Sequence, residues 1–102
     1  MTAVVSDAPH LRRYEATIDG RLAGFAAYRD EGTSRVFLHT EVFPEFEGKG
    51  VGSALARGVL DDVRASGRSL VALCPFVSDY VDRNPGYADL VDQGLDASLR
   101  AR

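Results

Sequence analysis

Gly48, Gly50 and Gly52 stand at alternate positions and form the segment with the clearest chemical meaning. So many glycines are a poor helix start on propensity alone, but they let the backbone approach another group closely. The free N–H groups of a first helical turn, together with the helix dipole, favour an anion at such a place. Pro44–Gly52 is therefore predicted to be a pyrophosphate-binding loop that runs into a helix. A tight β-α turn that needs small residues for packing is the alternative.

The glycine spacing distinguishes this loop from two other phosphate-binding motifs. No Gly-Lys-Ser or Gly-Lys-Thr follows at the distance that a nucleotide P-loop requires. The dinucleotide-binding fingerprint is excluded as well, because it needs a different spacing from that of these three glycines.

His39 and Glu41 form a titratable pair shortly before the loop. Because residues of a strand alternate between its two faces, the strand is expected to present two sets of side chains. One set is Phe37, His39, Glu41 and Phe43, and the other is Val36, Leu38, Thr40 and Val42. His39 or Glu41 could act as a general base, directly or through water. A polar pair on a solvated face, or a core histidine held by a carboxylate, is an equally good interpretation.

Cys74 is the only cysteine, and it stands between a predicted strand and a predicted helix. A thiol at the start of a helix tends to be reactive, so Cys74 could be a nucleophile or a proton donor. Free cysteines are also common as small buried hydrophobic residues. A lone thiol fits a reducing cytosol and excludes an internal disulfide.

An antiparallel meander is expected to carry the first of these residues. Arg13–Ile18 and Leu22–Tyr28 have the pattern of strands, and Asp19-Gly20 between them predicts a tight hairpin turn. A polar segment with Gly32 predicts a second turn, and Arg35–Val42 is the third predicted strand.

Helices around one further strand are expected to follow. Apolar residues recur every three or four positions from Gly50 to Ala65, which predicts a helix with one apolar face. Ser69–Cys74 is short and almost entirely apolar, the pattern of a strand covered on both sides. Phe76–Arg83 is expected to form a short helix. The order β-β-β-α-β-α predicts an α/β (α+β) fold with helices packed on a mixed sheet, whose crossover pairs the last two strands in parallel.

Composition limits the classes of protein that are possible. The chain has 102 residues, which predicts a single domain over residues 1–102 with a core of about residues 12–91. Met1–Leu11 lacks a clear period and Asp92–Arg102 has few apolar anchors, so both are expected to be loosely held.

With 12 basic and 15 acidic residues the net charge is −3, which argues against a nucleic-acid partner. No apolar run approaches a membrane span, so we expect a cytoplasmic protein, monomeric or homodimeric through an exposed sheet edge.

Three separated motifs agree in order and spacing with one known family. They are His39-Thr40-Glu41 followed by the loop Val42–Gly52, then Leu73–Val77, then Tyr80 with Pro85–Val91. Through these motifs nearly the whole domain resembles the GNAT (Gcn5-related N-acetyltransferase) superfamily, and in particular its minimal, single-domain YjdJ-type group.

The resemblance implies a cofactor, acetyl-CoA or coenzyme A, that lies between the third and fourth predicted strands. Its pantetheine would meet the backbone of Val42 and Phe43, and its pyrophosphate would meet amides of the loop. Glu47 stands where the superfamily usually has Gln or Arg, and a carboxylate repels a pyrophosphate unless it points outward or Lys49 offsets it. The cofactor-binding residues implied are Val42, Phe43, Glu47, Gly48, Lys49, Gly50, Val51 and Gly52, and no metal is expected.

The resemblance also implies N-acetyltransferase activity on a small-molecule or peptide amine. His39 and Glu41 would supply the base, and Cys74 would carry the acetyl group or protonate the leaving thiolate. Tyr80 corresponds to a general acid of many members, although its ring could equally pack against Phe76. The chain lacks the helices that members usually have between the first two strands, so a CoA-binding module or sensor without catalysis is the alternative. A structural domain with no ligand is a third, weaker possibility.

Overall fold

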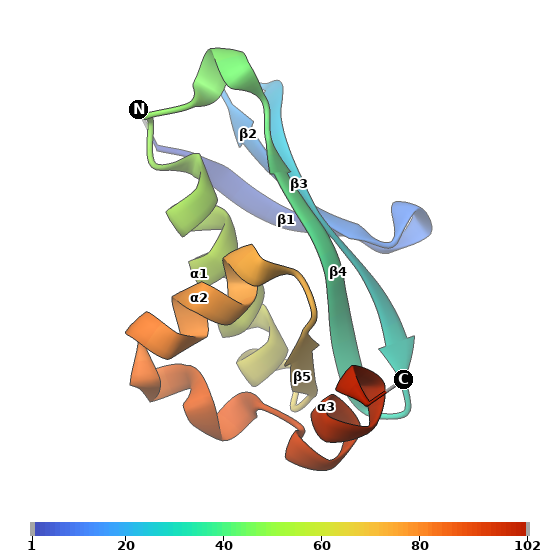
Figure 1. The fold of residues 1–102 in the computed structure, drawn as a ribbon. Coiled ribbons are helices and arrows are strands. Elements are labelled where there is room, and N and C mark those ends of the chain that lie inside the picture. The colour runs from blue at the N-terminus through green and yellow to red at the C-terminus, as the bar shows by residue number, and fades with distance from the viewer. Residues whose placement is uncertain (1, 102) are drawn as a thin grey trace.

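The computed structural model describes residues 2–101 as one five-stranded sheet with helices on its two faces (Figure 1). The strands lie in the order β1-β2-β3-β4-β5, antiparallel from β1 to β4 and parallel between β4 and β5. They are β1 Val4–Ala8, β2 Arg13–Ile18, β3 Arg21–Glu31, β4 Ser34–Val42 and β5 Ser69–Ala72. The α-helices are α1 Val51–Ala65, α2 Pro75–Arg83 and α3 Gln93–Arg100, and short 3-10 helices span Pro9–Leu11, Pro44–Phe46 and Pro85–Leu90.

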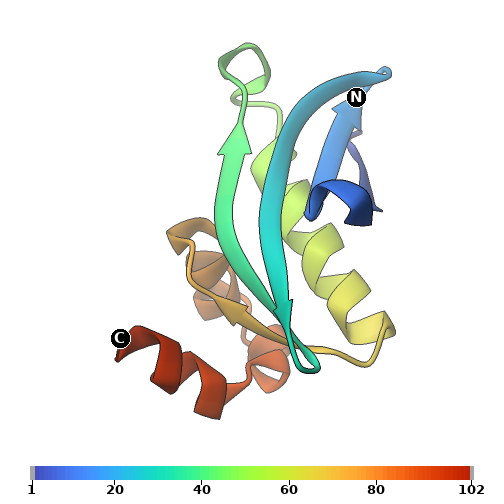
Figure 2. The same cartoon turned by 90° about the vertical axis from the view of Figure 1, so that its right-hand side faces the viewer.

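Helices α1 and α2 cover one face of the sheet, which we call the inner face, and the main core lies between them (Figure 1). Figure 2 shows the long strands β3 and β4 side by side, with α1 behind them and α3 at the foot of the sheet. A smaller core forms on the opposite, outer face, where Val36 and Val71 meet Leu99 of α3. Among residues 2–101 no helix is long and apolar enough to cross a membrane.

The sequence predicts most of these elements correctly, and the mixed α+β architecture is confirmed. β2 begins and ends at the predicted residues, and Asp19 and Gly20 form the hairpin turn with φ of 51° and 76°. Positive φ at both central residues gives the turn a twist that matches the flanking strands. The crossover through α1 pairs β4 and β5 in parallel, as predicted.

The N-terminal segment, which we expected to be loosely held, contains the edge strand β1. It pairs with β2 in the register Val4↔Thr17 to Ala8↔Arg13. The Tyr28 hydroxyl donates to Asp7 at 2.7 Å, and this bond ties β1 to β3. A strand of five residues that gains its order from a neighbour shows too little periodicity of its own to be recognised in the sequence.

The C-terminal segment, also expected to be loosely held, forms helix α3 with a cap. The Asp92 side chain accepts a hydrogen bond from the Leu95 N–H at 3.0 Å, and the Ser34 hydroxyl donates to Asp92 at 2.6 Å. The Arg100 guanidinium donates to the Ala72 carbonyl at 2.7 Å. These hydrogen bonds add to the few apolar contacts of the segment. A prediction based on apolar periodicity alone does not detect them, so it underestimates how well the segment is ordered.

A β-bulge changes which side chains of β4 share a face. Ala27 pairs with His39 but Tyr28 pairs with Phe37, so Leu38 is an extra residue on β4. The expectation that Phe37 shares a face with His39 is therefore wrong. Phe37 lies in the main core on the inner face, and beyond the bulge it is Thr40 that faces inward. The alternation fails because a bulge sets two residues of one strand against one of the other.

β4 and β5 part before β4 ends. Their pairing stops at Phe37↔Ala72, where the Phe37 carbonyl accepts from the N–H groups of Leu73 and Cys74 at 2.9 and 3.2 Å. β5 then turns into α2, while β4 continues along β3 to Val42. The far half of β4 thus has an open edge on the side of α2, among the residues that the structure describes.

Candidate active site

The loop between β4 and α1 has the backbone geometry of an anion site. Gly48 and Gly50 have φ of 79° and 75°, a left-handed conformation that glycine adopts without steric cost. Within the described residues, no atom lies within 4 Å of where a Cβ of either glycine would point. Gly50 is the N-cap of α1, and no described side chain accepts from the first-turn N–H groups. These amides are therefore free to bind an anion.

A cavity of about 270 Å³ lies over this helix start. Phe76, at the beginning of α2, forms its far wall, and a Cβ on Gly52 would come within 2.5 Å of the Phe76 ring. The cavity is lined by Val42, Phe46, Glu47, Gly48, Gly50, Val51, Gly52, Ser53 and Phe76.

Six of the eight predicted cofactor-binding residues line this cavity, whereas Phe43 and Lys49 are not among its lining residues. Glu47 and Lys49 are both exposed. The sequence analysis missed Phe46, Ser53 and Phe76 as lining residues. The helical pattern includes Ser53, but only the packing of α2 against α1 brings Phe76 to the loop.

Cys74 lies at the point where β4 and β5 part. It is the N-cap residue of α2, it is buried with 3% exposed, and its Sγ is 3.4 Å from Oγ1 of Thr40. Thr40 and Val42 are two residues apart, so both side chains lie on the inner face of β4. Val42 lines the cavity and Thr40 lies against Cys74, so this face of the strand runs from the cavity to the thiol. Cys74 itself is not among the residues that line the cavity.

His39 and Glu41 lie on the outer face of β4, away from Cys74. Nε2 of His39 is 3.5 Å from Oε1 of Glu41, and both side chains are about half exposed. The His39 ring meets the Phe25 ring edge-on at 5.9 Å. The structure brings the two predicted bases together, but it separates them from Cys74 by the width of the strand.

A family comparison agrees with this arrangement. The family model described as GCN5-related N-acetyl-transferase matches residues 13–90. This chain belongs to the GCN5-related N-acetyltransferase (GNAT) family. The match includes β2 to β5, the glycine loop, α1 and α2, and therefore every predicted site residue.

Two solved structures resemble this GNAT protein. A GCN5-like candidate N-acetyltransferase from Staphylococcus aureus superposes with a TM-score of 0.66 at 20% identity, over 86% of each chain. A candidate acetyltransferase of the GNAT family from Desulfovibrio desulfuricans gives a TM-score of 0.50 at 31% identity, over 59% of this chain and 40% of its own. The first likeness supports the fold. No curated protein matches this chain.

Tyr80 of this GNAT chain is a core residue. Its side chain is buried, with 8% exposed, and its ring packs against Tyr87 at a centroid distance of 6.3 Å. Its hydroxyl lies near enough to Arg57 of α1 to raise the pKa of that guanidinium. Tyr80 thus contacts α1 and the segment after α2.

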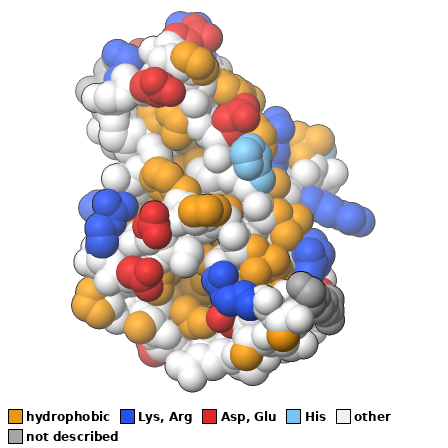
Figure 3. All heavy atoms as spheres, in the orientation of Figure 1, with side chains coloured by type: hydrophobic (Ala, Val, Ile, Leu, Met, Phe, Trp, Pro, Cys, Tyr) orange, Lys and Arg blue, Asp and Glu red, His pale blue; other side chains and the backbone are white. Residues whose placement is uncertain are grey.

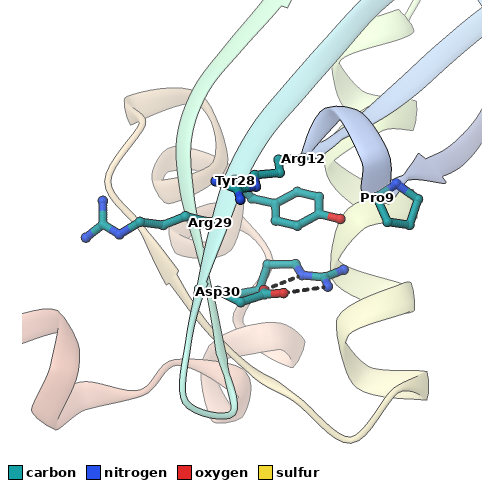
Figure 4. A pocket seen from close by; sticks show the side chains of 6 residues that line it. Pro9, Arg12, Tyr28, Arg29 and Asp30 are labelled. Carbon is teal, nitrogen blue, oxygen red and sulfur yellow. Dashed lines mark hydrogen bonds and ion pairs between the residues drawn. The ribbon is translucent and has the colours of Figure 1, made fainter.

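A larger cavity, of about 430 Å³, lies away from the glycine loop, beside Pro9, Arg12, Tyr28 and Arg29 (Figure 4). Arg35 donates to the two carboxylate oxygens of Asp30 at 2.8 and 3.1 Å and stacks on the Tyr28 ring at 4.0 Å. The Arg35 guanidinium holds the pKa of the Asp30 carboxyl below its ordinary value. Burial and the bond to Asp7 raise the pKa of Tyr28 to about 12. Because Arg35 is already paired, this cavity is a poorer match for a pyrophosphate than the uncapped helix.

Surface charge around the glycine loop is mixed. Figure 3 shows hydrophobic side chains gathered between the helices and the sheet, with Lys and Arg scattered rather than clustered. An anion at this site would therefore be bound mainly by backbone amides and less by basic side chains.

Proposed function

We propose that this GNAT protein is an acetyl-CoA-dependent N-acetyltransferase acting on a small-molecule or peptide amine. The observation that carries the proposal is the uncapped start of α1, which opens into a cavity that Val42 borders at the end of β4. Free amides beside a cavity, next to the strand β4 whose edge is open beyond Phe37, suit a long ligand with an anionic end.

The loop residues fit the pyrophosphate of acetyl-CoA. The N–H groups of Val51, Gly52 and Ser53 would bind it, and the helix dipole adds to their attraction. Glu47 is exposed, so its carboxylate can turn to solvent, and Lys49 beside it offsets the charge. Bound acetyl-CoA would supply the acetyl group as a thioester.

The positions of the titratable groups favour direct transfer. An amine on the outer face of β4 would lose its proton to His39 or Glu41, and the gap where β4 and β5 part would give it access to the thioester on the inner face. The amine nitrogen then bonds to the acetyl carbonyl carbon, the carbon–sulfur bond breaks, and Cys74 at the parting of the strands can protonate the leaving thiolate. Transfer through an acetyl group on Cys74 is the competing route.

A CoA-binding module without catalysis is the second candidate. The observation that favours it is the link between the first two strands, β1 and β2, which contains only the short 3-10 helix Pro9–Leu11. No α-helix is inserted at this place in the described chain, so the acceptor would have to bind to an open sheet face.

Binding and transfer can be tested separately. Acetyl-CoA at 100 times its Kd is expected to stabilise the protein by about 2.7 kcal/mol, which a thermal unfolding series measures. An amine panel assayed for thiol release then tests catalysis, and intact mass after incubation with acetyl-CoA tests the Cys74 route. We expect transfer that His39→Ala and Glu41→Gln together reduce by 10²-fold or more, on the order of a general-base contribution.

Each alternative predicts a different result. Acetylated Cys74 together with an inactive Cys74→Ala variant would establish the two-step route in place of direct transfer. Stabilisation by CoA without transfer to any amine would favour the binding module. The absence of stabilisation at millimolar CoA would contradict both functions.

A further inference from the structure

The outer face of β2, β3 and β4 is left open above α3. Along β2 the residues facing inward are buried, while those facing outward are half-buried. α3 covers the outer face only where Val36 and Val71 lie. One open face is common in antiparallel sheets, and it then usually carries polar side chains.

The centre of this open face is apolar instead. Phe25 on β3 stands between two carboxylates, because it pairs with Glu15 on β2 and with Glu41 on β4. Ala27, the next outward residue of β3, pairs with Arg13 on one side and His39 on the other. Ala27 has a small side chain, so little side-chain bulk stands on β3 beside the Phe25 ring.

Other aromatic side chains lie next to Phe25, on the side of the glycine loop. The centroid of the Phe43 ring lies 6.2 Å from that of Phe25, and the His39 ring meets Phe25 at 5.9 Å. The Arg13 guanidinium lies over the Phe25 ring at 4.9 Å, so a ligand would pack against the part of the ring that Arg13 leaves uncovered. Leu38, the bulge residue, adds an exposed apolar side chain with 40% of its surface accessible.

Among the described residues, this outer face carries one negative charge that no permanent positive charge balances. Arg13 donates to Glu15 at 2.6 and 2.9 Å, so these two charges neutralise each other. Among the described residues, the ion-pair partner of Glu41 is His39, at 3.5 Å. When His39 is neutral, as a general base must be, the Glu41 carboxylate leaves one negative charge beside two aromatic rings.

We infer that the outer face around Phe25, Phe43 and Glu41 is the acceptor site, and that the acceptor is a cationic primary amine bearing an aromatic or bulky apolar group. This inference rests on the proposed acetyl transfer. The ammonium group pairs with Glu41, and the apolar group lies on the rings. His39 takes one proton from the ammonium, and the neutral nitrogen then attacks the acetyl carbonyl carbon while the thiolate of CoA leaves. Acidic amines are disfavoured because Glu41 repels them.

Four candidate acceptor amines test the contributions of the aromatic rings and of the Glu41 charge separately. They are 2-phenylethylamine, which has an aromatic ring; propylamine, which has none; spermidine, which has no ring but several positive charges; and glutamate, which has negatively charged carboxylates. We expect 2-phenylethylamine to have the highest kcat/KM. Phe25→Leu keeps an apolar side chain at a half-buried position, and we expect it to raise the KM for 2-phenylethylamine about tenfold with a smaller effect on propylamine. Glu31→Gln, at the far end of β3, is the control and leaves all values unchanged.

Amine binding can also be measured without turnover. Backbone amide shifts of the CoA-bound protein are recorded during titration with 2-phenylethylamine, and we expect them to change at Phe25, Glu41 and Phe43. Binding at these residues without acetyl transfer would uphold the site and overturn the proposed catalysis. Transfer with equal preference for the four amines, or shift changes elsewhere, would overturn the site and uphold catalysis. A dimer that buries this face would also overturn it, and sedimentation over a concentration range detects such a dimer.

Discussion

At the scale of single residues, Gly50 shows how one position serves both the fold and the site. Helices commonly begin with Ser, Thr, Asp or Asn, whose side chains bond to the first N–H groups. Gly50 has no side chain, so the same N–H groups stay available to a ligand. Its φ of 75° also allows the chain to leave the loop and enter α1 directly. The residue type thus explains both the turn and the open amides.

Two substitutions at Gly50 are expected to separate these roles. Gly50→Ala places a Cβ at positive φ, and we expect it to lower the free energy of unfolding by about 1 to 2 kcal/mol. Asn adopts this conformation more easily, so Gly50→Asn should lose less stability, but its side chain can cap the helix and compete with CoA. Urea unfolding and calorimetric titration with CoA measure the two effects.

Gly86→Ala is the matched control for this prediction. Gly86 is not among the glycines with positive φ, and no described atom lies within 4 Å of its added Cβ. We expect its stability and CoA affinity to equal those of the wild type. If Gly50→Asn bound CoA as tightly as the wild type, the free amides of α1 would not be the binding groups.

At the scale of elements, strand β1 and helix α1 fit together through Gly58. A Cβ on Gly58 would lie 2.8 Å from Cβ and Cγ1 of Val5, closer than such atoms can approach. A glycine inside a helix costs about 1 kcal/mol relative to alanine, so its presence here needs a packing reason. The close approach of β1 provides one, and it explains how a short edge strand docks onto the helix.

A double-mutant cycle tests this contact. We expect Gly58→Ala to destabilise the wild type, because the clash with Val5 exceeds the gain in helix propensity. In the Val5→Gly background, which also removes the Cβ of residue 5, the same change is expected to be stabilising, since the helix gains up to about 1 kcal/mol without the clash. The coupling energy from urea unfolding should lie between about 0.5 and 3 kcal/mol. Additive effects would show that β1 does not pack against Gly58.

At the scale of the whole molecule, one polar network joins the sheet to α1. Arg35 of β4 bonds to Asp30 of β3, to Asp7 of β1 and to the Tyr14 hydroxyl of β2. The Tyr14 hydroxyl in turn donates to Asp62 of α1. Arg35 is buried, and its carboxylate partners are partly accessible. Breaking this network by protonation is therefore expected to affect the stability of the whole fold.

The sign of the acid dependence follows from Asp30. Arg35 lowers the pKa of Asp30 in the folded protein, so its contribution to stability is complete above the unfolded value and lost as the pH falls below about 4. Asp30→Asn cannot titrate, and we expect it to be less stable at pH 7 with a shallower loss between pH 4 and 2. Urea unfolding at several pH values measures both slopes, and equal slopes would contradict this role of Asp30.

The sequence by itself determined the order of the elements from β2 to α2 and the position of the glycine turn that begins α1. Hairpin residues, helical periodicity and glycine spacing are local properties, because backbone conformation depends mainly on neighbouring residues. This is why β2, α1 and the glycine turn between β4 and α1 could be predicted from residue types alone. Family motifs added the family and with it the expectation of an acyl-CoA cofactor, because several separated motifs agreed in order.

Only the tertiary structure decided which side chains meet. The bulge at Leu38 arises from pairing with β3, and it places Thr40 beside Cys74 while His39 faces the opposite side. Phe76 reaches Gly52 because α2 packs on α1. β1 and α3 owe their order to partners distant in the chain. Each of these features depends on contacts between residues far apart in sequence, and local periodicity carries no information about such contacts.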